Sequence, residues 1–472
     1  MSAPDVGPTT RFGRLETRGV LLGLSGTQLA VVGTATVVAV VAVYSAGMSG
    51  LVVASPVWAT LLVAGSVSVG GRPVVGWVPL LAQWHARKGT GATSTVATAG
   101  DVAPGRWLTL PGLPGRLELV DCDELGGVLV LERRTGTVTG VLRATGTGFV
   151  LEDAAAQEHK VAAWGRALAV ACQQSAIVRV QVLVNTRSGG LAPARRWWRE
   201  HCNASEPGLS AELAGMLDEG FVVPHVRETF VAIAVRAPRG RRRLSASDLA
   251  LVARHLESFG AAVQVAGLRA GGWIGRADLA RVLRAAYEPG ATARAEETPA
   301  ALVGSPGVRE RWGSLATGTG VHATYWVSQW PRTEVHPAFL QPLLLGEATD
   351  RTVTLVAEPL PTAQALREIR RAKVEHAADA AQRARIGQIE DESTRAEVAD
   401  LERREAELVA GHGDLRFTGL ITVSASGTSE LEERCAAMES AAAQAMCEVR
   451  RLVGQQGVAH AAACLPLARG VL

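Results

Sequence analysis

Two long apolar stretches without a charged residue occupy the first part of the chain, at residues 20–46 and 51–71. A transmembrane helix needs about 20 predominantly apolar residues, so each stretch is long enough to cross a bilayer. The segment between them, SAGMSG at residues 45–50, has the composition of a tight turn. The pattern therefore predicts a hairpin of two transmembrane helices within a membrane anchor that comprises residues 1–88.

Basic residues lie both before and after this hairpin, whereas the turn between the two stretches carries no charge. They are Arg11, Arg14 and Arg18 before the first stretch, and Arg72, Arg87 and Lys88 after the second. Cytoplasmic flanks of membrane helices are enriched in arginine and lysine, which places both chain ends in the cytoplasm. We therefore expect a multi-pass protein of the cytoplasmic membrane. Cleavage of the first stretch as a signal peptide is the alternative, although its apolar region exceeds the usual core of about 7–15 residues.

The segment that follows the second stretch has apolar residues at helical spacing, with tryptophans at positions 77 and 84. Amphipathic helices of this kind lie among lipid headgroups, where tryptophan is enriched. Arg72, Trp77 and Trp84 are therefore candidate membrane-interface residues. The alternative is a core helix of the next domain.

Beyond a linker at residues 89–106, short β-branched or alternating segments are interspersed with segments of helical periodicity. Strands are expected at residues 116–122, 127–132, 137–144, 177–186, 230–236, 263–268, 323–328, 353–358 and 416–424. Helices are expected at residues 157–174, 192–202, 210–218, 245–259, 279–286 and 429–452. This order, with no Gly-rich phosphate turn, predicts cytosolic α+β domains of ferredoxin-like type at residues 107–300 and 301–472.

The longest helical segment, at residues 363–410, is rich in alanine, arginine and glutamate and contains no proline. Its charged residues recur at helical offsets, but it lacks the regular apolar heptads of a coiled coil. We expect a helical hairpin with a break near Gly387. A single solvated surface helix is the alternative.

The sequence contains no recognisable catalytic, cofactor-binding or metal-binding motif. The chain has three lysines, and none is preceded by glycine, so no phosphate-binding P-loop is present. HExxH and GxSxG motifs are absent, and the six cysteines are isolated, which favours reduced thiols in the cytoplasm. We therefore expect no enzymatic activity, cofactor or metal.

The densest basic run consists of Arg239, Arg241, Arg242 and Arg243. Such a run can contact phospholipid headgroups or nucleic acid. A solvated loop before the next helix is the alternative, and the net charge of +3 argues against nucleic acid as a partner.

Several short motifs resemble a family of actinobacterial integral membrane proteins from gene clusters for type IV secretion or conjugation. They are RFGRLE and RGVLLGL at residues 11–16 and 18–24, GRP before WVPL at 71–80, GFVL before AWG at 148–165, YWV before WP at 325–331, FL before PLL at 339–344, EPLP at 358–361 and LPLARG at 465–470. The resemblance covers essentially the whole chain, and the order of the motifs is more specific than any one of them.

In that family the anchor looks like a PrgI-type inner-membrane subunit, fused to a part that looks like the N-terminal, non-motor domain of a VirB-type secretion ATPase. The resemblance implies a non-enzymatic inner-membrane scaffold that anchors a separate cytosolic ATPase. It further implies contacts with the lipid bilayer and other inner-membrane subunits, and we expect a homo-oligomer within a larger complex. A membrane-bound enzyme with an unrecognised site and a nucleic-acid-binding membrane protein remain the alternatives.

Overall fold

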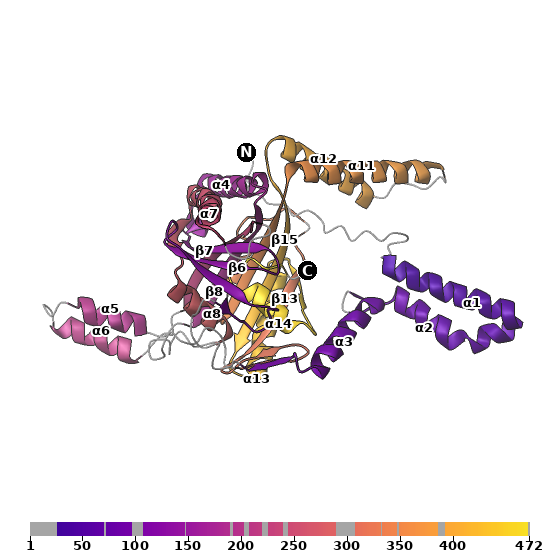
Figure 1. Cartoon of the computed structure of the whole chain (residues 1–472), viewed down its shortest axis with the longest axis horizontal. Coiled ribbons are helices and arrows are strands. Elements are labelled where there is room, and N and C mark those ends of the chain that lie inside the picture. Colours follow the sequence, from indigo (N-terminus) through magenta and orange to yellow (C-terminus); the bar gives the residue numbers. More distant parts are fainter. Residues whose placement is uncertain are drawn as a thin grey trace, which may run out of the picture. The chain divides into compact units, whose positions relative to one another are not determined.

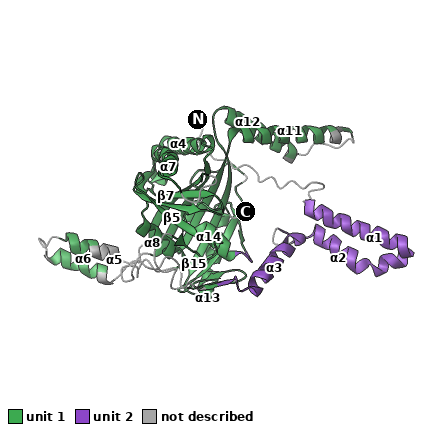
Figure 2. Cartoon of the chain, viewed as in Figure 1, with its two compact units in different colours: residues 1–13, 95–452, 456–472 green, residues 14–94, 453–455 purple. Residues whose placement is uncertain are grey.

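A computed structural model describes residues 26–69, 72–96, 107–146, 148–188, 192–202, 207–219, 225–238, 244–288, 307–331, 333–346, 349–385 and 392–470. The chain forms two compact units, shown along the sequence in Figure 1 and by colour in Figure 2. The smaller unit contains the apolar N-terminal region, and the larger one holds an antiparallel sheet with its helices. The fold class is therefore α+β with an apolar N-terminal helix.

The smaller unit consists of three helices and a two-stranded ribbon. These are α1 (Gly26–Val53), α2 (Ser55–Ser66), β1 (Ser68–Val69), β2 (Arg72–Pro73) and α3 (Val74–Gly89). Within α1, Ala46 and Gly47 leave helical geometry, and Gly47 has a φ of 64°. The second apolar stretch is not helical to residue 71 as predicted, because α2 ends at Ser66 and the β-branched Val67 is extended.

A proline near the start of α2 accounts for the boundary between α1 and α2. Pro56 has no N–H to donate to the preceding turn. The helical path nevertheless continues, because the Ala54 N–H donates to the Gly50 carbonyl (2.9 Å) and the Trp58 N–H donates to the Ala54 carbonyl (3.2 Å). Ala54 itself keeps a right-handed helical conformation.

In the larger unit, fourteen strands of the described residues form one sheet. The strands are β3 (Ser94–Val96), β4 (Trp107–Leu108), β5 (Leu117–Cys122), β6 (Gly127–Glu132), β7 (Thr137–Thr145), β8 (Ile177–Ser188), β9 (His225–Arg236), β10 (Arg269–Trp273), β11 (Gly307–Glu310), β12 (Leu315–Ala316), β13 (Val321–Gln329), β14 (Arg351–Leu360), β15 (Asp414–Ala425) and β16 (Glu448–Arg451). The helices are α4 (Ala154–Gln173), α5 (Ala192–His201), α6 (Pro207–Glu219), α7 (Ala246–Val265), α8 (Arg276–Tyr287), α10 (Gln341–Leu345), α11 (Thr362–Arg385), α12 (Glu392–Val409), α13 (Thr428–Gln444) and α14 (Gln456–Cys464), with a short 3₁₀ turn at Phe149–Leu151.

The sheet contains the same arrangement twice. The first half has β7, α4, β8, β9, α7 and β10 in chain order, and its strands lie in the order β10-β7-β9-β8. The second half has β13, α10, β14, β15, α13 and β16, with the strand order β16-β13-β15-β14. The first strand of each half also pairs with a preceding strand, β6 with β7 and β12 with β13. A helix follows the last strand of each half, namely α8 and α14.

The two halves join through β8 and β14, which pair antiparallel from Thr186 opposite Arg351 to Val180 opposite Ala357. The ranges predicted as two domains, 107–300 and 301–472, therefore share one continuous sheet and one compact unit. In both halves a pair of helices is inserted between the second and third strands. These pairs are α5 and α6 in the first half and α11 and α12 in the second.

Eight of the nine residues of helix α14 are buried, and the sheet supplies its end-capping partners. Its small side chains, four alanines among them, allow it to lie in the core. Gln181 of β8 donates to the carbonyls of Ala462 (3.0 Å) and Leu465 (3.1 Å), and Thr354 of β14 donates to that of Ala463 (2.6 Å). These bonds satisfy the carbonyls that a helix C-terminus leaves without partners. The last helix is therefore held by both halves.

The closing motif LPLARG continues this anchoring. The Ala468 N–H donates to the side-chain oxygen of Gln181 (2.7 Å), and Thr139 of β7 donates to the Leu467 carbonyl (3.3 Å). Arg469 forms a largely buried ion pair with Glu132. A motif that the sequence offers as a family resemblance thus has a packing role.

Two predicted elements are wrong. Residues 263–268 do not form a strand, because Val252, Leu256, Phe259 and Val263 form one buried helical face that carries α7 to Val265. The helix expected at residues 429–452 ends at Gln444, and β16 follows it. Met446 has a φ of 55°, so the chain reverses there and returns along β13.

The segment predicted as a helical hairpin at residues 363–410 contains two helices. α11 and α12 are packed against each other and bridged by an ion pair between Lys373 and Glu405 (2.5 Å). Ala365, Ile369 and Leu408 form a small apolar core with Leu360 of β14. Gly387, where a break was expected, lies outside the described residues.

Candidate functional site

The apolar surface of α1 is the feature of the described residues that points most directly to a function. α1 is the one described helix long and apolar enough to cross a membrane. Of its most apolar 18-residue segment, 11% is buried. Val40, Val52 and Tyr44 are 61%, 68% and 94% exposed. Exposed apolar side chains over this length are costly in water and match a lipid environment. A signal sequence near an N-terminus meets the same criteria.

Several polar side chains of α1 and α2 donate to carbonyls within these two helices. Thr34 and Thr36 donate to the carbonyls of Ala30 (2.8 Å) and Val32 (3.0 Å), four residues earlier. Gln28, buried in α1, donates to the Gly65 carbonyl of α2 (3.0 Å). In hydrocarbon every polar group must find an internal partner, so this arrangement suits a bilayer.

Glycine permits the close packing of α1 on α2. A Cβ at Gly65 would lie 2.6 Å from a methyl carbon of Val32, well inside contact distance. Small residues at such crossings are typical of helix pairs in membranes, where the backbones approach closely. α1 and α2 lie side by side in Figure 1.

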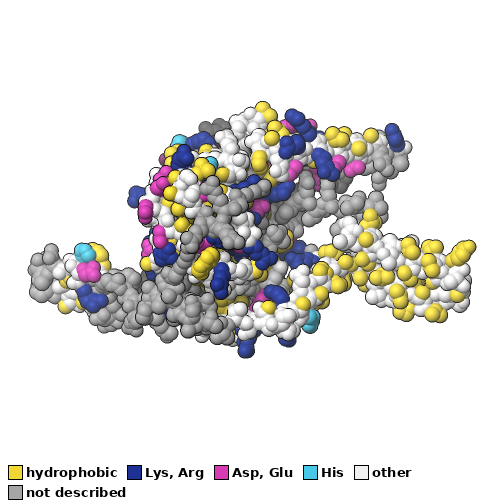
Figure 3. Space-filling view, in the orientation of Figure 1, with side chains coloured by type: hydrophobic (Ala, Val, Ile, Leu, Met, Phe, Trp, Pro, Cys, Tyr) yellow, Lys and Arg dark blue, Asp and Glu magenta, His cyan; other side chains and the backbone are white. Residues whose placement is uncertain are grey.

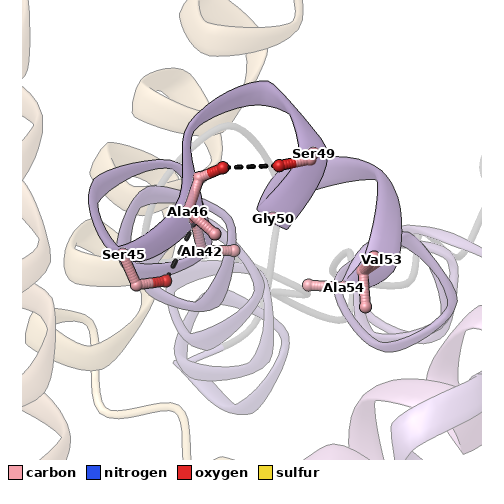
Figure 4. Close-up of a pocket in the computed structure, with 7 residues that line it drawn as sticks. All are labelled: Ala42, Ser45, Ala46, Ser49, Gly50, Val53 and Ala54. Atoms are coloured by element: carbon pink, nitrogen blue, oxygen red, sulfur yellow. Dashed lines mark hydrogen bonds between the residues drawn. The ribbon is translucent and has the colours of Figure 1, made fainter.

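A pocket lies where the chain reverses within α1 (Figure 4). Its lining residues are Ala42, Ser45, Ala46, Ser49, Gly50, Val53 and Ala54. The hydroxyl of Ser49 donates to the Ala46 carbonyl (2.7 Å), and that of Ser45 donates to the Ala42 carbonyl (3.2 Å). The serine hydroxyls are thus already engaged as donors, and the lining is otherwise small and apolar. We therefore interpret the pocket as a gap left by the turn and not as a ligand-binding site.

The predicted interface residues lie together in the smaller unit. Arg72 belongs to β2, and Trp77 and Trp84 are half-buried on α3, seven residues apart and therefore on one face. The guanidinium of Arg87 lies 5.7 Å from the centre of the Trp84 ring, a cation–π distance. The same helix exposes Val78 and buries Leu80. α3 is amphipathic as predicted, and its contact with lipid stays a prediction.

The other predicted basic contact cannot be placed. Arg239, Arg241, Arg242 and Arg243 all lie outside the described residues.

Sequence reasoning missed a buried histidine pair in the larger unit. His322 of β13 and His460 of α14 have ring centres 4.6 Å apart, and Tyr287 at the end of α8 lies 5.1 Å from His460. All three side chains are at most 1% exposed. The cluster therefore lies where the helices that follow the two halves meet. Isolated histidines in the sequence gave no sign of it, because β13 is buried on both faces and α14 was not predicted.

Hydrogen bonds fix the tautomer of the neutral His322 ring. Its Nε2 lies 3.0 Å from the Tyr287 carbonyl, which can only accept, so Nε2 carries the proton. Nδ1 then accepts from the Ser424 hydroxyl at 2.8 Å. Burial lowers the pKa of His322 to about 4. It also lowers the pKa of His460, and the neighbouring His322 adds to this effect.

The pair is a structural feature of the core. Both imidazoles are neutral at physiological pH, they are sealed from solvent, and Tyr287 donates its hydroxyl to the Pro111 carbonyl (2.8 Å). Within the described ranges, no group of three or more His, Cys, Asp or Glu side chains is arranged to hold a metal ion.

Comparison with known proteins does not identify the chain. No protein-family model matches it, and no curated protein matches it.

Proposed function

We propose that the protein is a non-enzymatic scaffold of the cytoplasmic membrane, anchored by a transmembrane hairpin. The observation that carries the proposal is the charge-free, exposed apolar surface of α1, on which Thr34 and Thr36 donate to carbonyls of their own helix. The stretch from Gly26 to the reversal at Ala46 contains about 20 residues, enough for one span. The helical path from Gly50 through α2 supports the second span.

The larger unit would form the cytosolic platform. We propose that each half is a ferredoxin-like β-α-β-β-α-β unit, which the repeated strand order supports. The platform would dock a separate secretion ATPase and other inner-membrane subunits of a type IV secretion or conjugation-like system. This proposal rests on the motif resemblance and on the absence of a P-loop from the sequence.

Topology is tested with single cysteines at Ser49 and Gly89 in a background where the exposed Cys202 is changed to serine. The proposal expects a membrane-impermeant thiol reagent, added to intact cells, to label position 49 and not position 89. Labelling of position 89 from outside would contradict the two-span anchor. Labelling of both after permeabilisation is the control that each site is reactive.

The scaffold role is tested by mild detergent extraction and affinity purification, followed by mass spectrometry of co-purifying proteins. We expect a P-loop ATPase among them, and a variant with its membrane spans intact but a deletion in the larger unit should lose it. Recovery of the anchor without any ATPase, under several mild detergents, would argue strongly against the docking role.

A further inference from the structure

The helix pair α5 and α6 exposes apolar side chains for which no partner surface exists within the described chain. Trp197 of α5 is 59% exposed, and Leu209 and Met216 of α6 are 55% and 57% exposed. Leu213, at 38%, completes a stripe on α6, because positions 209, 213 and 216 recur at helical spacing. We call these four residues the α5–α6 apolar face. Figure 3 shows hydrophobic side chains on this helix pair.

The duplicated architecture allows this exposure to be compared with that of an equivalent helix pair. α11 and α12 occupy the equivalent place in the second half, between the second and third strands. There Ala365, Ile369 and Leu408 are buried against Leu360 of the sheet. The second insertion thus buries part of its apolar surface against its own chain, although Val374 and Val409 stay exposed, whereas no α5 or α6 side chain of described burial is buried.

The charges of the two helices are opposite. α5, with the sequence APARRWWREH, contains three arginines and one glutamate, while α6, with the sequence PGLSAELAGMLDE, contains three acidic residues and no lysine or arginine. A two-fold axis places a patch against its own copy, so a self-complementary surface must carry both signs. An anionic lipid surface would attract α5 but repel α6. A second copy satisfies the charges of both helices.

We propose that the α5–α6 apolar face is a homodimer contact, in which the helix pairs of two copies form a four-helix bundle. α5 of one copy lies beside α6 of the other, and the apolar face becomes the bundle core. The proposed dimer contact does not depend on membrane anchoring, so the two proposals can be tested independently.

The native chain supplies a reporter for this contact. Cys202, directly after α5, is exposed, whereas the other five cysteines are buried. A nitroxide spin label added to the folded full chain in detergent should therefore attach at Cys202. We expect a dipolar interaction between labels on two copies and a dimer mass by light scattering. Dilution of labelled with unlabelled chain should reduce the dipolar signal.

The Leu213→Ser/Met216→Ser double variant should remove the dipolar interaction and weaken association roughly a hundredfold, because two large apolar side chains lose their burial. The matched control is Val374→Ser/Val409→Ser, which alters two exposed residues of α11 and α12. It should leave the interaction unchanged. Circular dichroism should show that both variants keep their helix content.

Charge reversal tests the pairing of α5 with α6. Arg199→Glu and Glu212→Arg should each weaken self-association, since each reduces the charge difference between the helices. A mixture of the two variants should associate more strongly than either alone, because one unaltered α5 then faces one unaltered α6.

Three results would overturn the proposal. The wild-type labels could show no dipolar interaction, or the interaction could persist in Leu213→Ser/Met216→Ser. Alternatively, the label could become buried only on transfer to nanodiscs containing anionic phosphatidylglycerol, without a dipolar interaction, which would identify lipid as the occupant.

Discussion

Acidification should destabilise the larger unit through the buried histidines, and His322→Gln should reduce that effect. The pKa of His322 is lowered to about 4 by burial, whereas in the unfolded chain it takes its ordinary value of about 6.5. Between these values the unfolded state binds the proton more readily, so stability falls as pH falls. Each pKa unit is worth about 1.4 kcal/mol, so His322 alone costs about 2 kcal/mol at pH 5 relative to pH 7 and about 3 kcal/mol by pH 4. His460 acts in the same direction.

The assay is urea unfolding of the full chain in detergent, followed by tryptophan fluorescence, at pH 7 and pH 5. His322→Gln changes packing at both pH values, so the informative quantity is the difference between them. We expect that difference to be about 2 kcal/mol smaller than in the wild type. His412→Gln, the same change at an exposed histidine, should leave the difference as it is. An unchanged pH difference in His322→Gln would show that this histidine is not buried in its neutral form.

Three further tests address the packing, two of them with a matched control variant. Leu256→Ala, at a side chain with no exposed surface, should lower the free energy of unfolding by about 3 kcal/mol, while Leu251→Ala, 45% exposed, should change it by less than about 0.5 kcal/mol, both measured by urea unfolding. Gly65→Leu should lower the thermal midpoint in detergent, because its Cβ would clash with α1, whereas Gly33→Leu has no neighbour within 4 Å and should not. Glu132→Gln should destabilise by about 2–4 kcal/mol, because it leaves its buried arginine partner without a counter-charge, and an unchanged urea midpoint would refute this.

Local pattern predicted most strands of the larger unit but not their arrangement. Strands such as β6, β8 and β9 are β-branched or alternating, so their own residues indicate them. The junction of the two halves depends on Thr186 opposite Arg351, which are far apart in the sequence. Single-sequence periodicity contains no information on such a pairing. The duplication was likewise hidden, because strand order depends on pairings that local periodicity does not contain.

The buried polar side chains explain why the centre of the fold could not be predicted. Gln181 and Thr354 suggest a solvated strand face when read in sequence, since polar residues in strands usually face water. In the structure they face α14 and bind its terminal carbonyls, so their polarity serves a buried helix end. The converse holds for α14, whose alanine-rich sequence shows no apolar stripe because eight of its nine residues are buried. The two anomalies explain each other, and replacing Gln181 with leucine would satisfy the strand pattern while removing the side-chain donor to the carbonyls of Ala462 and Leu465.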